Sequence, residues 1–502
     1  MGKDKKHLLI AFSIYLVGVI LFFNRFQFNI NPDAISYFSI SKKYFLSHYS
    51  EAINGYWGPL YSWIILPSFF LAIEPVVFAR LINVMFSFML LNLIYYYSAI
   101  INFDNRTKII AIYFFILPAL FFTFWYVTPD YLLLIITLIY ILMVLDENFL
   151  SDFKITLFSS FIASLMYLTK SYGLAFFLVF QSLVFLIFYL RKKELRKKIL
   201  LNYIISIIFF LMIISPWVYL ISNKYGYFTF STSGKINLLI VNPELNFHHP
   251  PIENGLIAPS DKYSVSAWDD PDVNLYPEWS PFKSMDDFKF FTFNLLKNIA
   301  KFFAMMFLFS PIGIITLIFF RKEFFQDQRI LILILAALIN GLGYCLIYVE
   351  NRYIWVSLVL FAMLSFIPIK KLFENIHQKR AVILIATFLI SLSTIPFILL
   401  AFKNYTYDNK AYHYSSFMKQ NFNIKGNIAS TSNWGFSLSL AYFLDSKYFG
   451  EEKKRYFDSE FLSKLKKFDI DYLFHYSKTD TTIDGLKFVA KIDSLYLFKV
   501  IK

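Results

Sequence analysis

The sequence is poor in charge and nearly without cysteine. Charged residues fill only 16% of the 502 positions, whereas soluble domains carry about 25%. The single cysteine, Cys345, lies in an apolar run, so no disulfide can form within the chain. The sequence also lacks a glycine-rich phosphate loop, a long low-complexity tract and a solenoid repeat. The shortage of charge excludes an ordinary soluble protein.

Apolar and aromatic residues fill the sequence instead. The hydrophobic fraction is 58% and the mean hydropathy is +0.54, with 62 phenylalanines and 35 tyrosines. These values predict a protein that crosses a membrane several times. The net charge of +14 does not indicate a nucleic-acid partner, because the basic residues cluster in short loops between apolar runs, where they set orientation.

About eleven apolar segments suit membrane-spanning helices of roughly 17–25 residues. The segment 59–73 is also apolar, but it is short and interrupted by Pro59 and Pro67, so we expect a juxtamembrane or re-entrant helix there. The chain is thus predicted to be a polytopic α-helical membrane protein. The predicted spans are 8–23, 76–100, 109–127, 131–145, 156–170, 172–190, 199–221, 295–320, 329–349, 353–369 and 381–402.

Basic loops give the predicted orientation. RKKELRKK (191–198) and KKLFENIHQKR (370–380) are strongly basic, as cytoplasmic loops are. With a cytoplasmic N-terminus, residues 24–75 and 222–294 form loops on the outer face of the inner (cytoplasmic) membrane. Because the number of spans is odd, the segment 403–502 lies on that face as well.

The last hundred residues are less apolar, and they predict a small extracytoplasmic α/β domain that follows a transmembrane domain of residues 1–402. The expected elements are strands at 427–431 and 470–476, helices at 436–444 and 461–468, and a closing hairpin over 486–500.

Ionisable residues from distant parts of the sequence fall on the predicted outer face. They are Asp33, Asp130, Lys170, Glu350 and Arg352. Charged groups at membrane depth are costly and are usually functional. Each also has a simpler explanation. The two aspartates could cap helices, and the lysine side chain could extend to the lipid head groups. Glu350 and Arg352 could form a structural ion pair. Their convergence on one face favours a functional site.

Several motifs stand in the order found in the GT-C superfamily of membrane glycosyltransferases. PDAISYFSIS around Asp33, TPDYLLL around Asp130, LTKSYGLAF around Lys170 and ENRYIW around Arg352 resemble motifs of its family-39-like branch. That branch includes the protein O-mannosyltransferases and the lipid A aminoarabinose transferase. GYWGPLYSW and SPWVYLISNKYGYF are similar to the segment that closes the first outer loop and to the end of the middle span.

The sequence departs from that branch at three places. Ala34 stands where many relatives have a second acid, and Ser171 replaces the glycine that follows the lysine. Trp57-Gly58-Pro59 stands where the aminoarabinose transferase has Lys-Pro. These departures leave the sugar and the metal requirement open.

The resemblance implies transfer of a sugar from a polyprenyl-phosphate donor to a hydroxyl of a lipid, glycan or protein acceptor, at the outer surface of the membrane. Asp33 would be the general base of a single, inverting displacement, and Asp130 would orient the acceptor. Lys170, Arg352 and Tyr353 would bind the donor phosphate. The residues expected to contact substrate are Tyr37, Glu51, Tyr56, Trp57 and Glu350.

Metal binding is left open by the sequence. Mg²⁺ or Mn²⁺ would suit two carboxylates if Asp33 and Asp130 shared an ion. His248 and His249 lie in the long outer loop, but their spacing matches no fixed zinc motif. The simpler interpretation of that loop is a proline-rich cover over the substrate cleft, whose aromatic residues, such as Trp268, stack on a sugar or pack together.

Two other functions remain from the sequence. A polyprenyl-lipid flippase or transporter would also be apolar and polytopic, but transporters more often show internal repeats and broken helices at mid-membrane. A polysaccharide polymerase or ligase would also use large outer loops.

Overall fold

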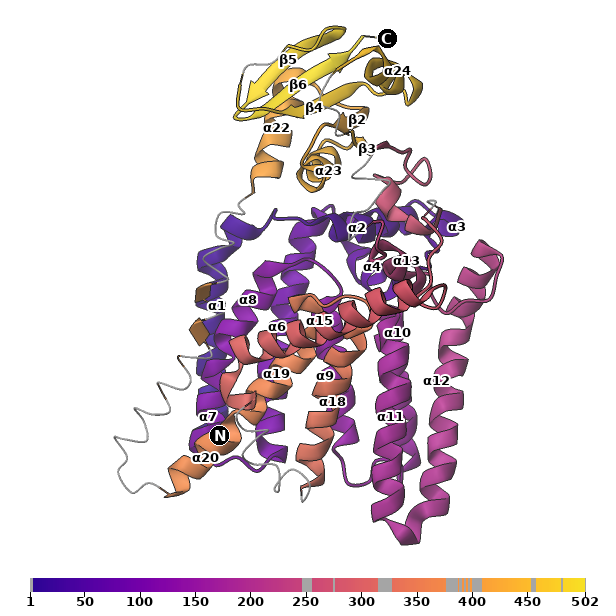
Figure 1. The fold of residues 1–502 in the computed structure, drawn as a ribbon. Coiled ribbons are helices and arrows are strands. Elements are labelled where there is room, and N and C mark those ends of the chain that lie inside the picture. The colour runs from indigo at the N-terminus through magenta and orange to yellow at the C-terminus, as the bar shows by residue number, and fades with distance from the viewer. Residues whose placement is uncertain are drawn as a thin grey trace.

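The computed structural model describes residues 3–245, 255–273, 276–314, 327–375, 409–452, 457–479 and 482–501, with a few isolated residues between 387 and 399. Apolar helices form a bundle that makes up most of the molecule. A smaller unit of helices and strands, residues 410–500, covers one end of the bundle (Figure 1). The predicted fold class, a polytopic helical protein with a C-terminal α/β unit, is confirmed.

Within the described residues, eight helical stretches are long and apolar enough to cross a membrane. Large apolar side chains such as Leu21 on the first helix and Met212 on the longest one are exposed, as hydrocarbon-facing surfaces require. The stretches are formed by α1 (Lys3–Phe26), α6 (Pro75–Ile100), α7 with α8 (Asn105–Phe114, Ile116–Trp125), α11 (Tyr172–Arg191), α12 (Arg196–Tyr225), α15 (Met285–Phe309), α18 (Gln328–Cys345), and α19 with α20 (Trp355–Leu364, Phe366–Asn375).

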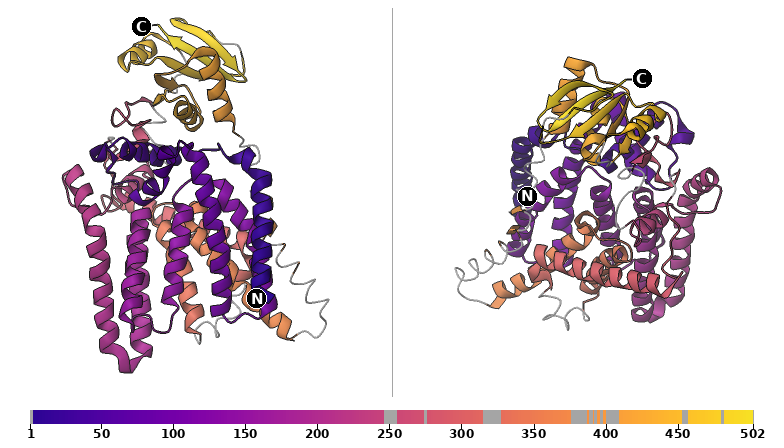
Figure 2. Two further views of the ribbon diagram at one scale, coloured as in Figure 1. Left: turned by 180° about the vertical axis from the view of Figure 1, so that it is seen from behind. Right: turned by 45° about the horizontal axis from the view of Figure 1, so that its top comes forward.

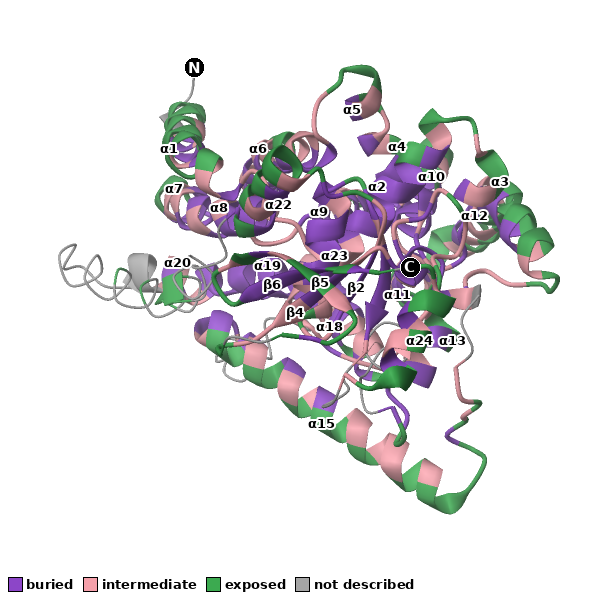
Figure 3. Cartoon of the chain, turned by 90° about the horizontal axis from the view of Figure 1, so that it is seen from above, coloured by how far each residue is buried: buried purple, intermediate pink, exposed green. Residues whose placement is uncertain are grey.

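Two further apolar helices, α9 (Asp130–Val144) and α10 (Phe153–Thr169), are shorter. Together with the eight stretches they coincide with ten of the predicted spans. The eleventh, 381–402, lies for the most part outside the described residues, so the count of eleven stays a prediction. Helix α15 begins earlier than predicted, because Ser284 caps it by accepting a hydrogen bond from the Asp287 backbone N–H at 3.0 Å. It lies across the outer edge of the bundle (Figure 3).

Short helices gather at the end of the bundle beneath the C-terminal unit. They are α2 (Pro32–Phe45), α3 (Tyr49–Ala52), α4 (Pro59–Ile65) and α5 (Pro67–Phe70). Proline opens α2, α4 and α5, since its missing N–H and fixed φ are tolerated only in a first turn. The segment 59–73 therefore forms two short helices. The N-terminus and the turn between α11 and α12 lie at the opposite end (Figure 2).

A six-stranded sheet organises the C-terminal unit, with strand order β1-β3-β2-β4-β6-β5. Strand β2 runs parallel to β3 and β4, and the remaining pairs are antiparallel. Helices α22 (Lys410–Phe422) and α23 (Trp434–Phe443) pack in the same hydrophobic core as Ile428 of β2. Helix α24 (Ser459–Lys467) packs in a second core, together with Ala429, the next residue of β2. Neighbouring residues of a strand face opposite sides, so the sheet is covered on both faces. The strands are β1 (Gly255–Leu256), β2 (Asn427–Ser430), β3 (Lys447–Glu451), β4 (Tyr472–Tyr476), β5 (Leu486–Ile492) and β6 (Leu495–Val500).

The edge strand β1 comes from the long loop between α12 and α15. It pairs antiparallel with β3, and the Tyr448 backbone N–H donates to the Val265 carbonyl at 2.7 Å further along the same loop. The sequence predicted β2, β4, β5 and β6, but it did not predict β1, β3 or α22. The proposed domain boundary at residue 402 falls outside the described residues and stays a prediction.

Candidate active site

Asp33 lies in the first turn of α2, at the end of the bundle beneath the C-terminal unit. Asn31 holds the cap position of this helix. One Asp33 carboxylate oxygen accepts a hydrogen bond from the Trp268 indole N–H at 3.1 Å, and the other accepts one from the Arg352 guanidinium at 2.7 Å. The carboxylate is therefore engaged in long-range contacts, which a simple capping role does not explain.

Arg352 connects three acidic residues. It lies in a short turn, η4 (Asn351–Ile354), between α18 and α19. Its Nε donates to Glu350 at 2.7 Å, and Nη1 donates to Asp33 while lying 3.9 Å from an Asp130 oxygen. Nη2 meets the Tyr353 hydroxyl at 3.4 Å. A planar guanidinium with five N–H donors suits such a branched arrangement.

Asp130 and Lys170 extend the arrangement. Asp130 opens α9 and is almost wholly buried, and its oxygens accept hydrogen bonds from the Thr128 hydroxyl and the Lys170 ammonium, each at 2.8 Å. The ammonium also lies 3.9 Å from the centre of the Tyr353 ring, within the range of a cation–π contact. We call Asp33, Asp130, Lys170, Glu350 and Arg352 the ionic network.

A close approach of two backbones positions Lys170. A Cβ atom at Gly58 would lie 2.5 Å from the Thr169 carbonyl oxygen and 2.7 Å from that of Leu168. Only glycine permits this contact. Through it the start of α4 packs against the last turn of α10, which ends beside Lys170. Glycine in the Trp57-Gly58-Pro59 run thus has a packing role.

The loop of residues 255–273 carries Trp268 to Asp33, and two ion pairs fasten it. Lys43 on α2 is only 1% exposed and donates to Asp261 at 2.7 Å. Lys224 on α12 pairs with Asp270 at 2.6 Å. Because Lys43 and Asp33 share one short helix, the first pair places the loop directly against the helix that bears the carboxylate.

Aromatic residues surround the Trp268 contact. The Trp57 indole N–H donates to the Trp268 carbonyl at 3.0 Å, and the Tyr56 ring centre lies 5.3 Å from that of Trp268. The Tyr56 hydroxyl donates to Asn237 on α13 (Ser233–Ile240) at 2.9 Å. Tyr37 is 2% exposed and packs edge-on against Trp57, so it is a core residue beneath this cluster.

Other predicted residues are not brought to the ionic network. The Glu51 carboxylate accepts a hydrogen bond from the Ser50 hydroxyl at 2.6 Å, and no contact between it and the network is found among the described residues. His248 and His249 lie outside the described residues.

Opposing effects act on Asp33. Burial raises the pKa of this carboxyl, but Arg352, the Trp268 indole and Lys170 together outweigh burial and hold the pKa below its usual value. Asp33 is therefore ionised at neutral pH.

The carboxylates do not fit a shared divalent cation. Among the described residues no group of three or more histidine, cysteine, aspartate or glutamate side chains is arranged so that it could hold a metal ion. Both Asp33 and Asp130 lie close to the same Arg352 nitrogen, at 2.7 and 3.9 Å. The guanidinium thus occupies the space between the two acids and supplies positive charge there, whereas Mg²⁺ and Mn²⁺ need several oxygen ligands around them.

Two contacts of the network were not predicted. Trp268 stands 235 residues after Asp33, so no local pattern joins them. Thr128 precedes Asp130 by two residues, in the motif TPD, and this short-range pairing of a hydroxyl with an acid was a signal available in the sequence.

Comparison with known proteins gives a likeness in structure alone. No family model and no curated protein sequence matches the chain. ArnT from Cupriavidus metallidurans, solved in the apo state and bound to undecaprenyl phosphate, is similar at 12% identity with a TM-score of 0.57 for the apo structure, over 99% of this chain and 98% of that one. The archaeal oligosaccharyltransferase AglB from Archaeoglobus fulgidus, in complex with an inhibitory peptide and a dolichol phosphate, is similar at 12% identity with a TM-score of 0.52, over 94% of this chain and 69% of that one. The chain has the GT-C fold. In this GT-C bundle the ionic network lies at the end that bears α2.

Proposed function

We propose that this protein is an inner-membrane glycosyltransferase that moves a sugar from a polyprenyl-phosphate donor to an acceptor hydroxyl. The observation that carries the proposal is the direct hydrogen bond between the Asp33 carboxylate and the Arg352 guanidinium at one end of a GT-C fold, since a carboxylate can act as a base and a guanidinium can bind phosphate. The undecaprenyl phosphate on ArnT and the dolichol phosphate on AglB support a lipid phosphate as the donor's carrier.

The reaction needs three changes, and the network has a group for each. The acceptor oxygen forms a bond to the anomeric carbon, the bond from that carbon to the phosphate oxygen breaks, and the hydroxyl proton passes to Asp33. The ionised carboxylate is able to take this proton. The products are the glycosylated acceptor and polyprenyl phosphate. A single displacement inverts the anomeric carbon.

Arg352 is placed to contact both groups whose charge changes in the reaction, Asp33 and the donor phosphate. Asp33 loses its negative charge when it takes the proton, while the departing phosphate gains one. Arg352 already holds Asp33, and its Nη2, which meets the Tyr353 hydroxyl only at 3.4 Å, is placed to donate to the phosphate. Lys170, 24% exposed, supplies a second positive charge. Such prearranged charge stabilises a transition state most where water is scarce.

Asp130 and the aromatic cluster belong to the acceptor side in this proposal. Asp130 orients the acceptor through its remaining lone pairs, and the partly exposed Tyr56 ring, packed against the buried Trp268, offers a flat apolar surface to a sugar. The network end of the bundle faces away from the cytoplasm, because the basic loops lie at the other end. No step requires a divalent cation.

The test uses purified protein in proteoliposomes with a polyprenyl phosphate that carries a radiolabelled sugar. We expect label to leave the lipid, either to an added acceptor or slowly to water. Movement of intact labelled lipid between leaflets, without cleavage of the sugar–phosphate bond, would instead show a flippase and refute the proposal.

A further inference from the structure

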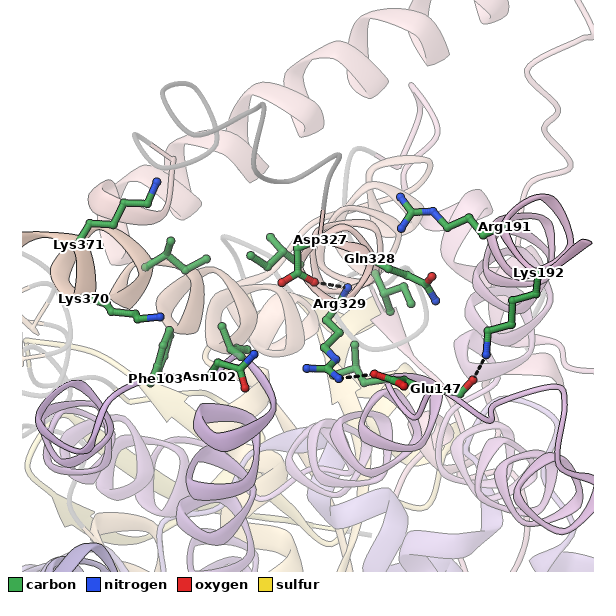
Figure 4. Close-up of a pocket in the computed structure, with 15 residues that line it drawn as sticks. Asn102, Phe103, Glu147, Arg191, Lys192, Asp327, Gln328, Arg329, Lys370 and Lys371 are labelled. Carbon is green, nitrogen blue, oxygen red and sulfur yellow. Dashed lines mark hydrogen bonds and ion pairs between the residues drawn. The ribbon is translucent and has the colours of Figure 1, made fainter. Parts of the chain in front are cut away.

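A cleft opens at the end of the bundle opposite the ionic network. Its volume is about 760 Å³, and its walls come from the ends of α6, α9, α11, α18 and α20 (Figure 4). Helices α9 and α11, which begin near the network, have 15 and 20 residues. At 1.5 Å per residue, the cleft therefore lies about 20–30 Å from the network. It is separate from the proposed active site, and we call it the basal cleft.

Positive charge predominates in the basal cleft. Of the lining residues, all within the described part of the chain, five are basic and two are acidic. Lys370 and Lys371 lie on one side, and Arg191 and Lys192 on the other (Figure 4). The basic lining residues are Arg191, Lys192, Arg329, Lys370 and Lys371, and the acidic ones are Glu147 and Asp327.

Both acids already have structural tasks. Glu147 pairs with Arg329 at 2.7 Å, and its backbone carbonyl accepts a hydrogen bond from Lys192. Asp327 caps α18 by accepting the Arg329 backbone N–H at 2.8 Å. Counted over the lining residues alone, basic side chains exceed acidic ones by three.

Most of the remaining wall is apolar, with Asn102 and Gln328 as its polar members. Ile101, Phe103, Leu145, Ile330 and Ile367 line it, and each is at most 8% exposed. A cleft that combines a basic rim with an apolar wall suits an amphiphile with an anionic head. Free inorganic phosphate would use only the rim.

We propose that the basal cleft binds the phosphate-bearing head group of an anionic membrane lipid. The cleft lies where helix ends meet the membrane surface, the depth at which such head groups are found, and basic pockets between membrane helices bind them elsewhere. A lipid seated here contacts α11 and α20 at once, because Arg191 and Lys370 both line the cleft. The proposal does not depend on glycosyl transfer.

The test measures lipid binding to the purified, delipidated full-length protein by native mass spectrometry. We expect phosphatidylglycerol to bind at least about tenfold more tightly than phosphatidylcholine with the same acyl chains. The Lys370→Ala/Lys371→Ala double variant should lose about 10–30-fold in phosphatidylglycerol affinity, since each basic residue near a charged membrane surface contributes about one kcal/mol. Lys42→Ala, which removes an exposed lysine at the other end of the molecule, is the matched control and should bind normally.

Two further arms, a charge-retaining variant and competition by inorganic phosphate, separate the possible explanations. Lys370→Arg/Lys371→Arg retains the charge and should restore the preference, which separates lost charge from lost fold. Equal binding of the two lipids by the unaltered protein overturns the proposal. Unchanged binding in the double alanine variant also overturns it. If 10 mM inorganic phosphate (about this concentration suffices for weak anion sites) displaces phosphatidylglycerol completely, the site is one for free phosphate and the lipid proposal fails.

Discussion

Among individual residues, the balance of charge in the ionic network is the feature that bears most on function. Three carboxylates, Asp33, Asp130 and Glu350, surround two cations, Lys170 and Arg352. In the proposed reaction a donor phosphate would therefore compete with these carboxylates for Arg352. Proton transfer to Asp33 would weaken that competition at the moment when the leaving phosphate gains charge.

The geometry of Arg352 is the first prediction. Arg352→Lys keeps the charge but loses the fork that joins Glu350, Asp33 and the phosphate, so we expect donor KM to rise about tenfold to a hundredfold, in line with charged hydrogen bonds of about 1.5–3 kcal/mol. Initial rates over a range of donor concentrations measure it. Arg329→Lys, which changes an arginine paired with Glu147 at the far end, should leave donor KM unaltered. Equal KM values in both variants would show that Arg352 only supports structure.

The Trp268 contact makes a prediction about pH. The indole N–H helps to lower the pKa of Asp33, so its removal in Trp268→Phe raises that pKa. Since Asp33 must be ionised to act as a base, the acid limb of kcat/KM should move to higher pH. Trp279→Phe loses an indole bond to Asp287 instead, and its profile should match that of the unaltered protein. Identical acid limbs in both variants would exclude Asp33 as the titrating base.

At the level of elements, the long loop joins the C-terminal unit to the ionic network. Its residues 255–256 add a strand to the sheet, and its residue Trp268 bonds Asp33 on α2. Helix α23 also touches the bundle directly, since Tyr442 donates a hydrogen bond to Glu74 at 2.9 Å. The C-terminal unit therefore helps to hold the loop of residues 255–273, which bears Trp268, beside the ionic network.

Two adjacent lysines on α2 test how this loop is fastened. Lys43→Met removes the buried partner of Asp261, and we expect a loss of about 2–3 kcal/mol in stability, less than for a fully buried pair because Asp261 is 23% exposed. Lys42→Met breaks an exposed pair with Asp445 and should cost at most about 0.5 kcal/mol. Thermal unfolding followed by tryptophan fluorescence compares them. Equal losses would mean that the Lys43 pair does not anchor the loop.

Much of the fold could be predicted because the residues of each helix or strand carry their own pattern of apolar and polar side chains. Apolar runs predicted the membrane helices, and short segments rich in apolar residues predicted β2, β4 and the β5–β6 hairpin. Strand β1 was not predictable, since two residues such as Gly255 and Leu256 carry no pattern and become a strand only by pairing with β3. Position along the chain does not determine which side chains meet: Glu51 stands in the same predicted loop as Asp33, but its carboxylate accepts a hydrogen bond from the Ser50 hydroxyl, and its predicted role with substrate stays a prediction.

In the whole molecule, the two ends of the bundle differ in character. The ionic network and the C-terminal unit lie at one end, and the basal cleft with the basic α11–α12 turn lies at the other (Figures 1 and 2). Positive residues favour the cytoplasmic side, so we propose that the end with the basal cleft faces the cytoplasm.

Reporter fusions test that assignment. A reporter placed after Lys198 should be active in the cytoplasm, and one placed after Lys262 or Lys502 should be active outside it. The prediction rests on the distribution of basic loops. A cytoplasmic signal from the C-terminal fusion would contradict the predicted number of spans and the outer location of the site.

The most direct measurement of the central claim is turnover and donor binding on one preparation of Asp33→Asn. The amide keeps the size of the carboxylate but cannot accept a proton at neutral pH, and loss of a general base typically costs about 10²–10⁴-fold in rate. Donor binding should persist or tighten, because Arg352 loses a competing anion. Asparagine caps a helix as well as aspartate does, so near-normal turnover would show that Asp33 acts structurally and would contradict the mechanism proposed for this protein.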